Sequence, residues 1–176
     1  MTAPRSWVFP YVEEPHSKPR HSDGSPVLRP ALEVTLVGPS GEQQSVLALV
    51  DSGCEHTLAA PFLVRAIQAD PDPNRELYLG IGGGSRQIRF TDVLLRIGPS
   101  GAAAEEFEEW QAEVGFFTSW EPPWPIILGQ IGFFDHFTVT MNRYSQALAV
   151  EAFDEFDKRF QVQMRESEDR RRRFRP

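Results

Sequence analysis

The stretch SVLALVDSGCEHTL, residues 45–58, decides how the rest of the chain is interpreted. Its first six residues are mostly apolar, as in a buried β-strand, and they run directly into Asp51, Ser52 and Gly53. A carboxylate is costly to bury alone, so Asp51 should lie at the exposed end of the strand or in a site that uses it. Gly53 permits a sharp turn, which the Ser52 hydroxyl can stabilise. Taken alone, Asp-Ser-Gly is most simply an ordinary turn.

Alternating and apolar runs on both sides of this stretch predict a mainly β domain. A proline at the first turn favours a short helix over residues 61–68, and a helical turn is expected at 131–137. Gly82-Gly83-Gly84-Ser85 should join two strands as the tip of a hairpin. The expected strands cover residues 31–37, 45–50, 77–81, 87–97, 107–117, 126–129, 138–141 and 147–151.

The tetrapeptide Gly-Pro-Ser-Gly occurs at residues 38–41 and again at 98–101. In each half of the chain, a strand, this turn and a second strand are followed by an apolar run that ends in a small-residue turn. The first run ends at Asp51-Ser52-Gly53 and the second at Leu128-Gly129. The repeated order of elements predicts a weak internal duplication.

Length and composition are those of an ordinary globular domain, with 176 residues, 40% of them hydrophobic and 24% charged. Cys54 is the one cysteine, which excludes an intrachain disulfide and a disulfide-stapled secreted scaffold. No signal peptide or membrane-spanning run is evident, so we expect a cytoplasmic protein without membrane contact. The net charge of −7 argues against nucleic-acid binding, although residues 165–176 carry six arginines.

Three segments, in their order along the chain, resemble those of the retropepsin-like aspartic proteases. Residues 47–54 are similar to the apolar strand that runs into Asp-Thr/Ser-Gly-Ala at the active site of that family. The glycine-rich hairpin at residues 81–85 looks like the family's flap. Residues 126–130 are similar to the apolar-apolar-glycine segment that precedes the family's helix. The resemblance covers about residues 29–151.

The resemblance implies a small closed β-barrel or sandwich of the retropepsin (acid protease) type, with one or two short helices. The domain would occupy residues 29–151, after an extended N-terminal arm at 1–28. Residues 152–176 would form a charged C-terminal helix or tail, because Phe153, Phe156 and Phe160 stand at helical spacing.

The resemblance also implies roles for individual residues. Asp51 would be the catalytic aspartate of an aspartic endopeptidase, and Ser52 would hydrogen-bond to the matching loop of a partner. Gly53 would let the two loops approach, while Leu128 and Gly129 would support the loop from behind. No cofactor and no metal are implied. The flap and substrate-binding residues would be Ile81, Gly82, Gly83 and Gly84.

The implied chemistry needs two aspartates that share a proton. One accepts a proton from the attacking water, and the other donates a proton to the carbonyl oxygen of the peptide. The sequence holds no second Asp-Thr/Ser-Gly, so the second aspartate must come from another copy of the chain. We therefore expect a homodimer that acts on a protein or peptide substrate.

Two departures from the family pattern bear on this hypothesis. Cys54 stands where the family usually has alanine; its thiol can pack as a small hydrophobic group and, if exposed, could be oxidised. The chain also continues well past residue 151, which leaves the mode of dimerisation open.

Rival functions remain at this stage. The same fold could bind or scaffold peptides without cutting them, since fold does not determine function. A nucleic-acid adaptor could use the arginine-rich tail. Residues 80–85 lack the third glycine of a dinucleotide fingerprint, and His56 with Cys54 makes no metal-ligand set. Trp110, Trp120 and Trp124 are more simply packing residues than a ligand-stacking surface.

Overall fold

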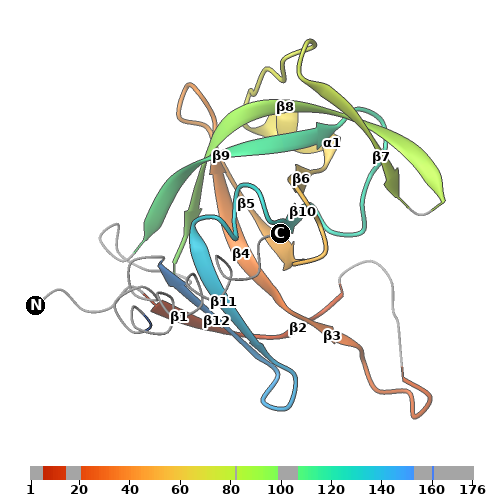
Figure 1. Ribbon diagram of the computed structural model, residues 1–176, viewed down its shortest axis with the longest axis vertical. Coiled ribbons are helices and arrows are strands. Elements are labelled where there is room, and N and C mark those ends of the chain that lie inside the picture. The colour runs from red at the N-terminus through yellow and green to blue at the C-terminus, as the bar shows by residue number, and fades with distance from the viewer. Residues whose placement is uncertain (1–5, 15–20, 82, 99–106, 153–159, 161–176) are drawn as a thin grey trace, which may run out of the picture.

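The computed structural model describes residues 6–14, 21–81, 83–98, 107–152 and Phe160 (Figure 1). Within these residues the chain forms twelve β-strands and one short helix, α1 (Pro61–Ala66). The helix begins with Pro61, whose fixed φ suits the first helical position. Strands, and not helices, therefore build the core and position the site.

Six strands close into a barrel at the centre of the fold. They are β4 (Ala31–Val37), β5 (Gln43–Val50), β6 (Thr57–Ala59), β8 (Gly84–Ile97), β9 (Glu108–Phe117) and β10 (Ile126–Leu128). Their order is β4-β5-β10-β6-β9-β8, and β8 closes the barrel by pairing with β4. β7 (Glu76–Ile81) extends the sheet beyond β8, and the β7–β8 hairpin projects from the barrel in Figure 1.

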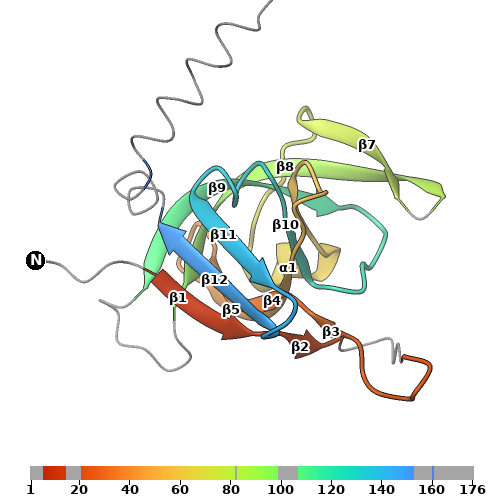
Figure 2. The same ribbon diagram turned by 60° about the horizontal axis from the view of Figure 1, so that its bottom comes forward.

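A three-stranded antiparallel sheet packs against the barrel and comes forward in Figure 2. It consists of β1 (Ser6–Pro10), β11 (Phe137–Asn142) and the central strand β12 (Ala147–Ala152). Leu148 and Val150 of β12 belong to the same buried cluster as Leu36 and Val114 of the barrel. The N-terminal segment thus adds a strand to this sheet. It then continues into a short ribbon of β2 (Val12–Glu13) and β3 (Leu28–Arg29).

The strand pairing contains two related halves, but β5 corresponds to β9, so the Asp51 turn does not correspond to Leu128-Gly129, contrary to the expectation from the sequence. β5 runs parallel to β10, and β9 runs parallel to β6, so the long strand of each half pairs with the short strand of the other. β6 and β10 pair antiparallel, as do β4 and β8. The loop that follows β5 and carries Asp51 therefore corresponds to the loop between β9 and β10. Residues 99–101 of the second turn lie outside the described residues.

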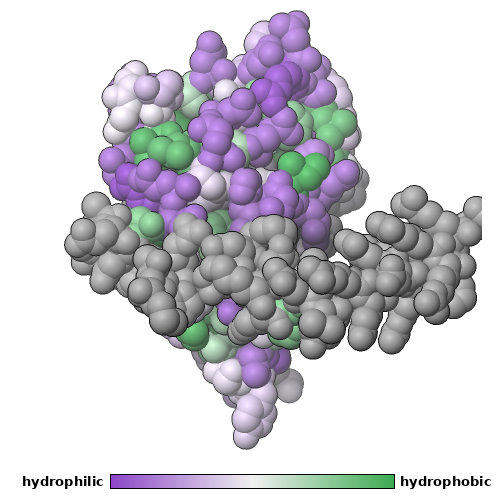
Figure 3. All heavy atoms as spheres, turned by 60° about the vertical axis from the view of Figure 1, so that its left-hand side comes forward, coloured by the Kyte–Doolittle hydropathy of each residue, from purple (hydrophilic) through white to green (hydrophobic). Residues whose placement is uncertain are grey.

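The exposed surface gives no separate indication of function. On the face shown in Figure 3, the described residues are mostly hydrophilic, and hydrophobic side chains gather in small separate patches. Large exposed apolar side chains are scattered over different elements, such as Val8, Phe62 and Tyr144. Scattered exposure of this kind is normal for a folded domain. Among the described residues, no helix is long and apolar enough to span a bilayer.

The prediction of a mainly β fold with a closed barrel is confirmed, and the expected strands match the observed ones to within a few residues. The sequence does not predict β6, because three fully buried residues show no alternation. At residues 132–136 the chain makes turns, with one hydrogen bond of helical spacing, from Phe137 N to Phe133 O, at 3.0 Å. Gly132 has a φ of +94°, which no α-helix accommodates.

The C-terminal helical extension predicted for residues 152–176 lies outside the described residues, apart from Ala152, which ends β12, and Phe160. The division of the chain into arm, domain and tail remains a prediction.

A first test concerns Trp110, which ties β9 to the turns that follow β10. Its Nε1 donates a 2.7 Å hydrogen bond to the buried carbonyl of Gly132, and its ring meets Phe137 edge-on with centroids 4.8 Å apart. Trp110→Phe leaves that carbonyl unpaired, so the free energy of unfolding should fall by about 1–3 kcal/mol. Urea unfolding measures the change. Tyr144→Phe, at a fully exposed side chain, is the control, and equal stability of the two variants would contradict the expectation.

Candidate active site

Asp51 lies at the end of β5, where the backbone turns sharply. Its N–H donates to the carbonyl of Leu128 at 3.0 Å, so the last parallel pairing of β5 with β10 reaches the aspartate itself. Its Oδ1 accepts a 2.9 Å hydrogen bond from the N–H of Gly53, and its carbonyl accepts one from Cys54 N at 3.1 Å. Asp-Ser-Gly therefore is a turn, and that turn holds one oxygen of the carboxylate in place.

The segment after β10 clamps this loop from behind. Gln130 N donates to the carbonyl of Cys54 at 2.9 Å, and Ile131 N donates to the carbonyl of Glu55 at 2.8 Å. A Cβ on Gly129 would lie 2.3 Å from the carbonyl oxygen of His56, so no side chain fits there. Gly129 thus lies against the loop by close approach of the two backbones.

Two supporting residues are not predicted from the sequence. Thr57 is the buried polar residue of the described core, and its hydroxyl accepts a 3.2 Å hydrogen bond from Gly129 N. Gln130 donates from Nε2 to the carbonyl of Ser52 at 2.7 Å. A threonine directly before the apolar run Leu58-Ala59-Ala60 is the signal that could have indicated a buried hydrogen bond.

A pocket of about 550 Å³ opens beside Asp51. Its apolar lining comes from Pro30 before β4, from Leu49 and Val50 of β5, and from the end of β7, the loop between β9 and β10, and β10 itself. Ile81 comes from β7 and Ile127 from β10, and the loop between β9 and β10 provides Trp120, Pro123 and Trp124. The structure thereby brings the aspartate, the glycine-rich hairpin and the Ile-Ile-Leu-Gly segment to one cavity.

The remaining predicted site residues differ in their exposure and in the element that carries them. Ser52 and Gly53 are exposed at the tip of the turn, and Leu128 is fully buried beneath it. Gly83 and Gly84 lie in the β7–β8 hairpin, where Gly83 has a φ of +78°. Gly82 lies outside the described residues. Exposed Ser52 leaves its hydroxyl free to meet another molecule.

The pocket's other carboxylate belongs to Glu14. Its side chain is only 11% exposed and lies 3.7 Å from Arg29, which also lines the pocket. Arg29 therefore supplies Glu14 with a partner of opposite charge. Asp135 does not line this pocket, and its Oδ1 accepts a 3.1 Å hydrogen bond from the backbone N–H of Gly132.

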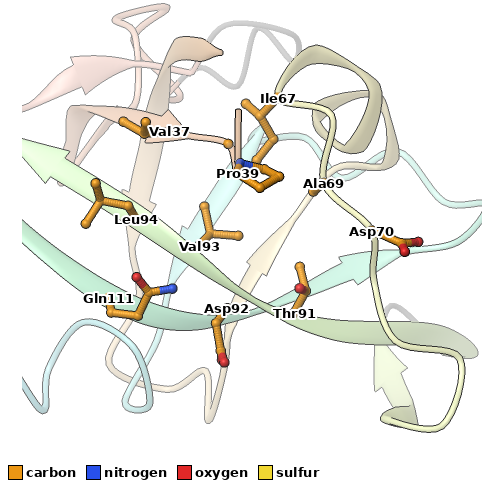
Figure 4. Close-up of a pocket in the computed structure, with 11 residues that line it drawn as sticks. Val37, Pro39, Ile67, Ala69, Asp70, Thr91, Asp92, Val93, Leu94 and Gln111 are labelled. Atoms are coloured by element: carbon orange, nitrogen blue, oxygen red, sulfur yellow. The ribbon is translucent and has the colours of Figure 1, made fainter. Parts of the chain in front are cut away.

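A second pocket, of about 420 Å³, lies away from Asp51 and is shown in Figure 4. It opens between the turn at Pro39, the end of α1 and strands β8 and β9. Asp92 lines this pocket and lies 3.6 Å from Arg75, so it is neither unpaired nor a neighbour of Asp51. Neither pocket contains a cluster of metal-ligating side chains, and the described residues as a whole hold none.

Cys54 packs as a hydrophobic residue and does not form a nucleophilic pair with His56. Its Sγ donates to the backbone carbonyl of His56 at 3.1 Å, and the His56 ring instead meets Phe90 edge-on at 5.0 Å. Burial raises the pKa of the Cys54 thiol, and the negative charges of Asp51 and Glu55 add to this rise. The neutral thiol is therefore favoured, which is opposite to the activation that a nucleophilic cysteine needs.

No protein-family model matches the sequence, and a search of curated proteins finds no match. The structure is similar to a retropepsin-like aspartic protease from Rickettsia conorii, with 11% identity, 86% of this chain and 97% of that chain covered, and a TM-score of 0.46. It is also similar to the retroviral protease-like domain of Ddi1 from Leishmania major, with 15% identity, 70% and 94% covered, and a TM-score of 0.40. The geometry around Asp51 therefore has to carry the functional conclusion.

The clamp behind the loop can be tested at Gly129. Gly129→Ala forces the backbone away from His56, so the free energy of unfolding should fall by about 1–3 kcal/mol. Gly80→Ala is the matched control, because a Cβ there would meet nothing within 4 Å. Thermal and urea unfolding measure both variants. If Gly129→Ala is as stable as Gly80→Ala, the loop is not held by close backbone contact.

Proposed function

We propose that the chain is an aspartic endopeptidase whose catalytic pair consists of Asp51 from each of two subunits. The observation that carries the proposal is the position of Asp51. It stands at a strand end, in a turn held by Leu128 and Gly53, and beside a pocket that the β7–β8 hairpin helps to line. A carboxylate held this firmly beside a mostly apolar pocket suits a reaction on a peptide better than it suits a plain turn.

The dimer supplies what one chain lacks. Among the described residues that line the pocket, Asp51 has no second aspartate beside it, and Glu14 already pairs with Arg29. Ser52 and Gly53 are exposed, so two copies of the turn can approach across a two-fold axis. Such an approach would place the two Asp51 carboxylates together and give the Ser52 hydroxyl a partner in the other subunit.

The reaction then follows from two carboxyl groups that share one proton. Like charges at close range do not both ionise cheaply, so one group is a carboxylate and the other a carboxylic acid. The carboxylate accepts a proton from water as the water oxygen bonds to the carbonyl carbon of the peptide. The carboxylic acid donates its proton to the carbonyl oxygen. As the tetrahedral intermediate collapses, the C–N bond breaks and the amine leaves with the proton that the first carboxyl group took from water. A hydroxyl of the intermediate returns its proton to the other carboxylate, which restores the pair.

The pocket suggests the general kind of substrate. Its lining is apolar around Ile81, Trp120 and Ile127, and apart from Asp51 its polar side chains are those of Arg29 and Glu14. An extended peptide with a large apolar side chain next to the cleaved bond would bury that side chain there. The neutral form of Cys54 and its contact with the carbonyl of His56 leave the chemistry to the aspartates.

Asp51→Asn tests the proposal directly. Cleavage of denatured casein, and self-cleavage, should fall by at least about a thousandfold while the fold and the dimer persist. In an equimolar mixture with wild type that is allowed to re-equilibrate, only about a quarter of the dimers keep both aspartates, and activity per dimer should fall in proportion.

Two results would contradict the proposal. One is cleavage of casein by Asp51→Asn at the wild-type rate. The other is activity in the mixture that follows the number of wild-type chains, because one Asp51 would then be enough. Wild-type protein that binds peptides without cutting them would favour the scaffold function instead.

A further inference from the structure

Arg86 lies on the β7–β8 hairpin, opposite Leu79. The carbon of its guanidinium group is 5.4 Å from the ring centroid of Trp120. The same group lies 3.5 Å from the point that a Cβ on Gly84 would occupy. The guanidinium is therefore placed between the indole of Trp120 and the backbone close to the hairpin tip.

Trp120 is a firmly held platform for this contact. Its ring meets Phe117 edge-on, with centroids 4.8 Å apart, and packs on the buried cluster around Leu58 and Phe90. The loop that carries it continues through Pro122, Pro123 and Pro125, and prolines restrict the backbone. A hairpin residue that stacks on Trp120 is thus tied to the opposite wall of the Asp51 pocket.

The contact between Arg86 and Trp120 gives only a modest net stabilisation. A guanidinium over an indole face gains a cation–π interaction, which strengthens as water is excluded. Against this gain, the Nε of Arg86 is buried and has no hydrogen-bond acceptor among the described residues. The cost of an unpaired N–H is of the same order as the cation–π gain. Such a contact can hold the hairpin in place and still be broken by a competing ligand.

We propose that Arg86 and Trp120 form a latch that holds the β7–β8 hairpin over Asp51. Ile81, on the same hairpin, lines the Asp51 pocket together with Trp120, so the latch determines how closely the hairpin covers a bound peptide. Arg86 is then a positioning residue, since it acts through the hairpin. The latch is a property of the fold alone, whereas its effect on cleavage rests on the proposed function.

Hydrogen–deuterium exchange in the 176-residue chain tests the latch without any substrate. Arg86→Met and Trp120→Leu should each speed amide exchange several-fold at residues 78–81 and 84–87, and the double variant should add little, because both changes break one contact. Arg86→Lys keeps the cation and should be intermediate. Arg89→Met is the matched control. It removes an arginine of the same strand that pairs with Glu76 at 3.4 Å and should leave exchange at those residues unchanged.

Unchanged exchange in Arg86→Met, or fully additive effects in the double variant, would overturn the latch. Equal acceleration by Arg89→Met would overturn it too, because any loss of an arginine would then loosen the hairpin. These readouts do not depend on activity, so they stand even if Asp51→Asn disproves the protease. Where cleavage is observed, Arg86→Met should raise KM several-fold and change kcat by less than about twofold. A fall in kcat at constant KM would instead place Arg86 in the chemistry.

Discussion

The parallel pairing of β5 with β10, extended by the contact of Gly129 with the loop after β5, is the constraint on which the site depends. Because a glycine stands at 129, the two backbones approach more closely than any side chain would allow, and a Cβ would lie 2.3 Å from the carbonyl oxygen of His56. This approach lets Leu128 and Gln130 bond to both ends of the Asp51 turn. The backbone thereby holds the aspartate in place, and the proposed catalysis would require such preorganisation.

The same geometry explains why the proposed site would need two chains. The barrel contains two related halves, but the loop of the second half carries Trp120 and a run of prolines where the first half carries Asp51. The first loop thus supplies a carboxylate, and the second supplies an apolar wall and a platform for the hairpin. The barrel thus combines two related halves of one chain, whereas the proposed function requires a second copy of the chain to supply the second carboxylate.

Much of this arrangement is accessible from the sequence, and the rest is not for identifiable reasons. Alternation locates most strands, and Asp51, Gly129 and the glycine-rich hairpin stand in the predicted order along the chain. β6 is not predicted because its three buried residues show no alternation, and residues 132–136, where a helical turn is expected, form turns with one hydrogen bond of α-helical spacing. The contact of Arg86 with Trp120 joins residues 34 positions apart that no local pattern connects. The roles of the individual site residues remain predictions that mutation must test.

The most direct test of the central claim is the dependence of cleavage on protein concentration, measured together with sedimentation equilibrium. If two chains build the site, activity per chain should rise with concentration and follow the fraction of dimer, reaching a plateau when dimerisation is complete. At concentrations where the protein is monomeric, cleavage should vanish. Constant activity per chain across the monomer range would contradict the account, because a single Asp51 would then suffice.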